Sequence, residues 1–239
     1  MIKSSFFSLV VLTLLFLGGC TQAPDSDSAT TTATKEVATN TAKSESWAVD
    51  VAASKIVWVG TKVTGYHSGP LAIKSGELLV QNESIVGGKF VIDLSSIRVT
   101  GPNGSDEASN IKLTAHLKSA DFFDAANYPD ATFEITSVEP FAGAAEPTVS
   151  QDDNKLEAIS EYKVPNPTHT ISGNLTIKNV TKNIQFPAKI TLSDNSVDAI
   201  AKFNIDRLQW NITYPGKPND LIRNEIHLGI ALKANKQVE

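Results

Sequence analysis

The stretch "IQFPAKITL", residues 184–192, decides the fold class of this 239-residue chain. Its large apolar side chains stand at every second position. Successive side chains of a β-strand point to opposite faces, so this spacing predicts a strand with one buried face. The same alternation occurs in residues 86–94, 171–177, 199–205 and 226–232. Further strands are expected at residues 55–63, 73–80, 132–138 and 156–164.

The links between these strands are short and carry Asn, Asp and Ser, which are typical of tight turns. Eight or more antiparallel strands with one apolar face each can form a sandwich or a closed barrel. One helix is expected, Asp106–Leu117, with Ile111, Leu113 and Leu117 near one face. The pattern therefore predicts an all-β antiparallel domain with a short helical insertion in mid-chain.

Residues 1–19 are expected to be a signal peptide. Lys3 precedes the uncharged apolar run Phe6–Leu17, which is too short to span a bilayer stably. The run ends in "LGGC", residues 17–20, which resembles the bacterial lipobox, where the chain is cut before a cysteine that becomes acylated. Because Cys20 is the only cysteine, no disulfide can form within the chain, and the domain must be stabilised by its core.

Residues 20–46 are expected to be the lipidated cysteine and a disordered tether rich in Ser, Thr and Ala. Residues 21–46 are nearly free of large apolar groups, so they cannot bury enough surface to offset their ordering entropy. A flexible segment of this length reaches roughly 25–30 Å. The folded domain is then predicted at residues 47–239, a length that suits a single domain.

The charge of the chain narrows the choice of partners. Its net charge is −5 and it has no basic run, which argues against nucleic acid as a partner. It also argues against binding to anionic lipid through a basic patch. Membrane attachment is therefore expected to come from acyl chains on Cys20, of which two or more are needed for a firm hold.

The dense stretch "AHLKSADFFDAANYPDATFEI", residues 115–135, can be interpreted as architecture. Ser119 and Asp124 each stand where a helix N-cap would lie, and Pro129 ends the second turn. The aromatic side chains that follow them are expected to point at the open end of a barrel. The predicted barrel cap consists of His116, Ser119, Asp121, Phe122, Phe123, Asp124 and Tyr128.

The same stretch also allows a catalytic interpretation, with His116 and Asp121 as a base and its orienting carboxylate. No serine or cysteine nucleophile with a recognisable elbow accompanies them, so no catalytic residue is predicted. His67, His169 and His227 are isolated in the sequence, so no metal site is predicted either. His227 is expected to be solvated on the polar face of the last strand.

Three ordered motifs resemble the YceI family of lipid-binding proteins. The first is "HLKSADFFDAANYPDATFEI", the second is "GNLTIKNVTKNIQFPAKI", and the third is "FNIDRLQW" followed by "DLIRNEIHLGIALKA". The likeness covers residues 47–234. The chain departs from the family pattern at Trp210 and Asn211, where Phe-Gly is often found, and in the longer segment 143–170.

The resemblance implies an extended, lipocalin-like antiparallel barrel of about eight strands that holds a long isoprenoid chain in its lumen. A barrel of that size has room for side chains or one slender ligand. Arg207 is expected to pair with Asp206 or a neighbouring acid; alternatively it contacts a headgroup oxygen of the ligand. The residues expected to face the ligand are Trp58, Phe90, Ile92, Phe133, Leu175, Ile177, Phe186, Ile190, Phe203, Ile205, Leu228 and Ile230.

The function expected from these observations is binding, with no reaction and no required cofactor. A membrane-tethered lipoprotein would sequester or carry an isoprenoid quinone or polyprenyl lipid. The alternative is a stress-response or interaction module with a filled barrel core and its function on the loops. Thr21 is not the aspartate that retains many lipoproteins at the inner membrane, so the outer membrane of a bacterial cell envelope is favoured. The oligomeric state stays open, a homodimer included.

Overall fold

Antiparallel strands make up most of the structure, a computed structural model that describes residues 22–37, 43–143 and 162–237. The strands are β1 (Thr30–Thr32), β2 (Glu45–Val49), β3 (Lys55–Lys62), β4 (Gly65–Gln81), β5 (Ser84–Asp93), β6 (Asp130–Pro140), β7 (His169–Ile177), β8 (Val180–Leu192), β9 (Ser196–Asp206), β10 (Gly216–Lys217) and β11 (Asp220–Lys236). The helical elements are η1 (Leu94–Ser96), α1 (Glu107–Lys118) and η2 (Arg207–Trp210).

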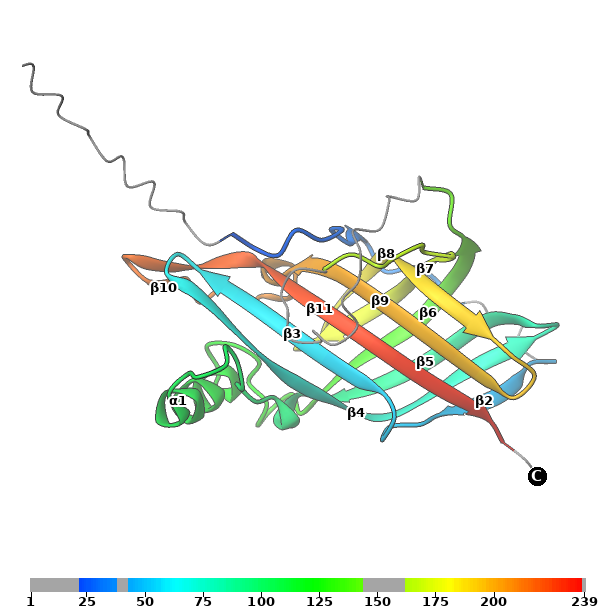
Figure 1. The fold of residues 1–239 in the computed structure, drawn as a ribbon, viewed down its shortest axis with the longest axis horizontal. Helices are drawn as coiled ribbons and strands as arrows, with labels where there is room; N and C mark the ends of the chain where they lie inside the picture. Colours follow the sequence, from blue (N-terminus) through cyan, green and yellow to red (C-terminus); the bar gives the residue numbers. More distant parts are fainter. Residues whose placement is uncertain (1–21, 38–42, 144–161, 238–239) are drawn as a thin grey trace, which may run out of the picture.

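Eight of these strands close into a barrel. Each of β3 to β9 pairs antiparallel with the next, and β11 pairs with both β9 and β3 to complete the ring. Figure 1 shows the strands running side by side along the molecule, with α1 lying outside one end. The prediction of an extended antiparallel barrel with one helical insertion is thus confirmed.

The barrel strands coincide with predicted segments, with two differences. β4 begins at Gly65 rather than Ile73, because Gly65–Leu71 pairs with β3 although glycine and proline interrupt its alternation. The strand predicted at residues 156–164 lies outside the described residues up to residue 161, and residues 162–164 form no strand. The alternation of apolar and polar residues therefore failed to locate the part of β4 in which glycine and proline interrupt it.

The end of the barrel opposite α1 is filled by packed side chains. β2 takes over from β3 between β4 and β11, where Ala48 lies opposite Glu77 on one side and Asn235 on the other. The buried apolar side chains that meet here are Trp47, Val49, Val80, Val197 and Ala234. We call this cluster the closed end of the barrel.

α1 begins after Asp106, whose carboxylate accepts a hydrogen bond from the main-chain N–H of Ser109 at 2.7 Å. Leu117 is buried and Leu113 packs against the core, so this side of the helix faces the barrel. Ile111 is 64% exposed, and its predicted place on the same face is wrong. The reason is geometric: residues two apart on a helix point in nearly opposite directions. Among the described residues, every helix is too short or too polar to cross a bilayer.

The predicted disordered tether is ordered over residues 22–37, so that prediction is wrong for this part. Residues 24–35, which we call the strap, run along the outside of the barrel where β8 and β9 separate. β1 pairs with β8, Thr31 lying opposite Ile184. On the other side, Asn204 of β9 donates its main-chain N–H to Asp27 and accepts from Ala29, both at 2.8 Å. The strap therefore connects the two strand edges that would otherwise lack partners.

Hydrogen bonds to asparagine side chains of the barrel hold both ends of the strap. The side-chain amide of Asn204 donates to the carbonyl of Pro24 at 2.8 Å. The side chain of Asn174 accepts from the Lys35 main-chain N–H at 3.1 Å and donates to its carbonyl at 2.7 Å. Composition could not show this, because the partners are asparagines on distant strands.

We expect Asn174→Ala to release the last part of the strap. Without the amide, both main-chain groups of Lys35 lose their protein partner, which corresponds to about 1–1.5 kcal/mol of local stability. Hydrogen exchange at the Lys35 amide should then become roughly tenfold faster, while amides of β7 and β8 keep their protection. Thr32→Ala is the control, because its hydroxyl contacts only the neighbouring carbonyl of Ala33. Equal exchange in both variants would contradict the role given to Asn174.

His227 is not solvated as predicted: only 4% of its surface is exposed. Its Nδ1 lies 3.0 Å from Oδ1 of Asn204, and the ring of Tyr162 packs edge-on against it at 4.6 Å between centroids. Burial, with a smaller contribution from the charge of Lys202, lowers the pKa of His227 to about 4. Tyr162 comes from the segment before β7, so alternation along β11 could not indicate that this outward face is covered.

The depressed pKa of His227 predicts acid sensitivity. The unfolded chain binds this proton with a pKa near 6.5, so the stabilisation is full above that value and is lost as the pH falls towards 4. Between pH 7.5 and pH 5 the free energy of unfolding should drop by about 2 kcal/mol on this account. Urea unfolding at both pH values measures the drop, and His227→Gln should remove that share of it. An unchanged pH dependence in the variant would refute the assignment.

Candidate ligand-binding site

A cavity of about 410 Å³ lies inside the barrel. The alternating strands direct their apolar side chains into it, because the outer face of each strand meets solvent or the strap. All twelve side chains predicted to face a ligand line this one cavity, and so does Arg207. The structure thus brings the predicted residues together, and their contact with a ligand stays a prediction.

One wall of the cavity is aromatic. The rings of Phe90 and Phe133 lie 6.2 Å apart between centroids, Phe133 and Phe186 lie 5.8 Å apart, and Phe186 stacks on Phe203 at 4.0 Å. β7 lies between β6, which carries Phe133, and β8, which carries Phe186. Gly173 of β7 has no side chain, which leaves room for the ring of Phe133. A Cβ at Gly173 would lie 2.2 Å from Cζ of Phe133, so any larger residue would displace the ring.

α1 and the turn after it lie over the end of the cavity that is opposite the closed end. Leu113, His116, Leu117, Phe122 and Phe123 all line the cavity there. The His116 ring makes edge-on contacts with Phe122 and Tyr214, with centroids 5.0 and 4.8 Å apart. Of the predicted cap residues, His116, Phe122 and Phe123 line the cavity, and their role as a cap stays a prediction.

The other predicted cap residues shape the turn without lining the cavity. Ser119 is the C-cap of α1, not an N-cap, and its hydroxyl donates to the carbonyl of His116 at 2.8 Å. Asp124 has a φ of 49° and closes the turn, and its main-chain carbonyl accepts from Tyr128 at 2.8 Å. Asp121 lies 2.9 Å from Nε2 of His116 on the exposed side of the turn. Ser119 therefore ends α1, whereas the sequence analysis placed the start of a helix there.

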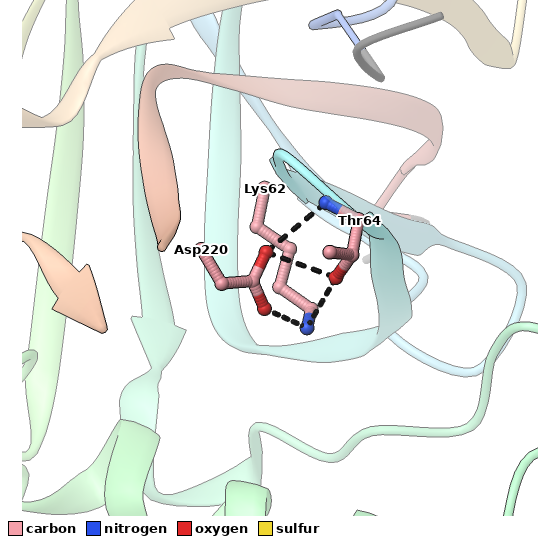
Figure 2. Close-up of polar contacts among 3 residues, drawn as sticks. All are labelled: Lys62, Thr64 and Asp220. Atoms are coloured by element: carbon pink, nitrogen blue, oxygen red, sulfur yellow. Dashed lines mark hydrogen bonds and ion pairs between the residues drawn. The ribbon is translucent and has the colours of Figure 1, made fainter. Parts of the chain in front are cut away.

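Charged side chains gather at this same end of the cavity, next to the cap. Lys62 at the end of β3 forms an ion pair with Asp220 at the start of β11, and Thr64 donates to Asp220 from its main-chain N–H at 3.0 Å and its hydroxyl at 2.9 Å. Figure 2 shows these three side chains, which link the turn between β3 and β4 to the start of β11. The bond to Lys62 is the main cause that lowers the pKa of Asp220 to about 2. The side chains of Lys62 and Asp220 line the cavity and are 32% and 18% exposed, so solvent reaches the cavity at this end, which we call the open end.

The family follows from the sequence between residues 47 and 234, which matches the model of the YceI-like domain. The chain belongs to the YceI-like family. No curated protein sequence matches the chain. The solved structures that resemble this YceI-like protein include the following two. BcnA of Burkholderia cenocepacia is 19% identical, over 78% of this chain and 99% of that chain, with a TM-score of 0.54. A polyisoprenoid-binding domain from Saccharophagus degradans, implicated in plant cell wall breakdown, is 16% identical, over 80% and 98%, with a TM-score of 0.51. At these identities the likeness shows the shared fold.

Arg207 of this YceI-like protein does not pair with Asp206, so that expectation is wrong. Its guanidinium donates to the main-chain carbonyls of Arg223 at 3.1 Å, of Ile222 at 3.5 Å, and of Ile212. The Asp206 carboxylate accepts from the main-chain N–H of Leu208 instead, because it caps η2. Burial lowers the pKa of Arg207, and the charge of Asp206 acts in the opposite direction. The buried arginine therefore holds η2 and the following loop against β11.

Three polar atoms on side chains that line the YceI-like cavity have no hydrogen-bond partner among the described residues. They are Nε1 of Trp58 and Oγ1 of Thr61 on β3 and Nδ1 of His67 on β4. Burial is the main cause that lowers the pKa of His67, which favours the neutral ring. Unsatisfied buried polar groups are costly, so these atoms are suited to a polar group of a ligand.

Sequence reasoning missed several residues that line the YceI-like cavity. Ile56, Ile73 and Ile226 continue the inward faces of strands already predicted, and their alternation could have found them. Trp210, Ile212 and Tyr214 follow β9 in η2 and an irregular loop, where no period exists to indicate a direction. Among the described residues, no three His, Cys, Asp or Glu side chains meet as metal ligands.

Proposed function

We propose that the barrel binds a long isoprenoid lipid, of the quinone or polyprenyl type, and sequesters or carries it without a chemical reaction. The observation that carries the proposal is an apolar cavity along the barrel with its few polar groups at one end. That arrangement matches a molecule with a hydrocarbon tail and a small polar head. The polyisoprenoid-binding domain with the same fold supports this choice of lipid. An empty volume of this size also favours a ligand over a filled core.

Free energy supports a role in which the ligand exchanges with a membrane. Burying hydrocarbon gains about 0.8 kcal/mol per CH₂ relative to water, so a few isoprene units suffice to hold a lipid. Relative to a bilayer interior the gain nearly vanishes, because both environments are apolar. Selectivity must then come from the aromatic wall and from polar atoms such as Trp58 Nε1. We therefore expect slow release into water and faster release into membranes.

Native mass spectrometry of the protein purified from a bacterial host, with organic extraction, tests the proposal. The chain used must include the strap, because residues 24–35 complete the wall between β8 and β9. We expect a stoichiometric adduct that extracts as an isoprenoid. A bare protein that also refuses added quinone and polyprenol would refute the lipid proposal.

We further propose that acyl chains on Cys20 attach the protein to a bacterial membrane, the outer one being favoured by Thr21. Cys20→Ala should then abolish palmitate labelling and move the protein from the membrane fraction to the soluble fraction. The reason is that the substitution removes the one residue proposed to carry the acyl chains, of which two or more are needed for firm membrane binding. Membrane recovery that is equal in both proteins would contradict the tether.

A further inference from the structure

The open end of the barrel carries exposed apolar side chains on three separate elements. Ile111 on α1 is 64% exposed, Leu221 at the start of β11 is 49% exposed, and Leu208 in η2 is 38% exposed. Each of them neighbours residues that line the cavity, namely Leu113, Asp220 and Arg207. We call these three residues the apolar rim. Single exposed apolar residues are common, so the rim needs a second observation to acquire meaning.

That second observation is the direction in which the N-terminus leaves the barrel. The strap bonds Pro24 to Asn204, which lies two residues before the end of β9 at Asp206. In Figure 1 the start of the described chain, β10 and α1 all lie toward the same end of the long axis. Two residues of chain reach at most about 7 Å, so Cys20 stays within that distance of Gln22.

The strap therefore fixes which end of the barrel a lipid on Cys20 would hold near the membrane. β11 runs for 17 residues, about 55 Å at ~3.3 Å per residue, from the open end toward the closed end. An anchor with a reach of a few ångströms cannot bring the closed end to the bilayer while the strap stays bound. The rim thus belongs to the end of the barrel at which the anchor lies.

We propose that the open end of the barrel lies on the bilayer surface, with Ile111, Leu208 and Leu221 in contact with lipid. This rests on the proposed tether through Cys20. In this orientation an isoprenoid tail passes between bilayer and cavity without crossing water. Each CH₂ kept out of water avoids about 0.8 kcal/mol, which would otherwise slow the transfer.

Added tryptophans on the acylated protein test the orientation. The native Trp47, Trp58 and Trp210 are at most 7% exposed, so they give a constant background. The protein is purified with its anchor and placed in phosphatidylethanolamine–phosphatidylglycerol vesicles that contain brominated acyl chains, which quench tryptophan at the interface. We expect Ile111→Trp and Leu221→Trp to lose about half of their added emission, because tryptophan favours the membrane interface.

Two matched variants serve as controls. Val51→Trp replaces a residue that is 46% exposed in the turn after β2, next to Asp50, which bonds Lys233 near the closed end. Val57→Trp replaces one that is 44% exposed on the wall of β3. Both should keep their emission. Quenching of Val51→Trp as strong as that of the rim variants, or no quenching of any variant, would overturn the proposal.

Mass spectrometry of the N-terminal peptide and of bound lipid separates this proposal from the proposed function. An unmodified Cys20 overturns the orientation, since nothing then holds the N-terminus at the bilayer, and leaves isoprenoid binding standing. A bound isoprenoid with unquenched rim variants likewise overturns the orientation alone. Quenched rim variants on a protein that refuses every isoprenoid support the orientation and refute the lipid proposal.

Discussion

Ala201→Trp is expected to empty the barrel while leaving it folded. Ala201 lies on β9 opposite Ile230 of β11, is 6% exposed, and lines the cavity. An indole at this position projects into space that the ligand would occupy. Overpacking of a filled site costs about 1–3 kcal/mol, so the fraction of protein that carries an isoprenoid should fall roughly tenfold or more. Native mass spectrometry with lipid extraction measures the fraction.

Ala231→Trp is the matched control for this change. Ala231 follows Ile230 on β11, lies opposite Ile200, and is exposed on the outer face of the barrel. Its variant should keep the adduct, because the indole points to solvent. An adduct of equal size in both variants would show that the cavity is not where the lipid lies. A melting temperature for Ala201→Trp close to that of the parent separates lost binding from lost folding.

Trp210→Ala should be the most destabilising single change considered for this chain. The side chain is fully buried, and its Nε1 donates to the carbonyl of Leu175 at 3.0 Å, which ties η2 to β7. Removing a buried tryptophan costs about 3–5 kcal/mol through the cavity left behind, and the Leu175 carbonyl also loses its partner. Equilibrium urea unfolding measures the loss.

Leu208→Ala tests whether the effect belongs to Trp210 or to any change in η2. Leu208 is 38% exposed, so its truncation should alter the free energy of unfolding by no more than about 0.5 kcal/mol. A loss below about 1 kcal/mol for Trp210→Ala would mean that η2 is not needed for the stability of the barrel.

The barrel could be predicted from the sequence because its two faces differ in chemistry at every second residue. Phe186 and Ile190 point inward for the same reason that Lys189 and Thr191 point outward, and no tertiary information is needed to see it. The inward direction of most of the twelve cavity residues follows from this pattern, and the expectation that they face a ligand came from the resemblance to the YceI family. The pattern could not separate the cavity from packed core, because an alternating strand looks the same in both cases.

Several features that sequence analysis missed depend on partners outside the local pattern of the chain. The strap is polar, and its partners are β8 and the distant asparagines Asn174 and Asn204. His227 is buried because Tyr162 covers it, and Arg207 bonds carbonyls of an irregular loop and of β11. Local composition does not indicate such contacts, so each prediction assigned the environment that is commonest for that residue type.

The ring closes by pairing its first strand, β3, with its last, β11, and this sets the order of events when the protein forms. Ser54 beside β3 bonds Lys233 of β11 across a sequence separation of 179 residues, and the strap meets β9 across 180. A chain that emerges from its N-terminus can pair β3 with β4 early, but the other edge of β3 stays unpaired until β11 arrives. Such distant pairings make folding slow and leave strand edges open to aggregation in the meantime. Loss of even the last few pairs of β11 should thus affect the folding of the whole barrel.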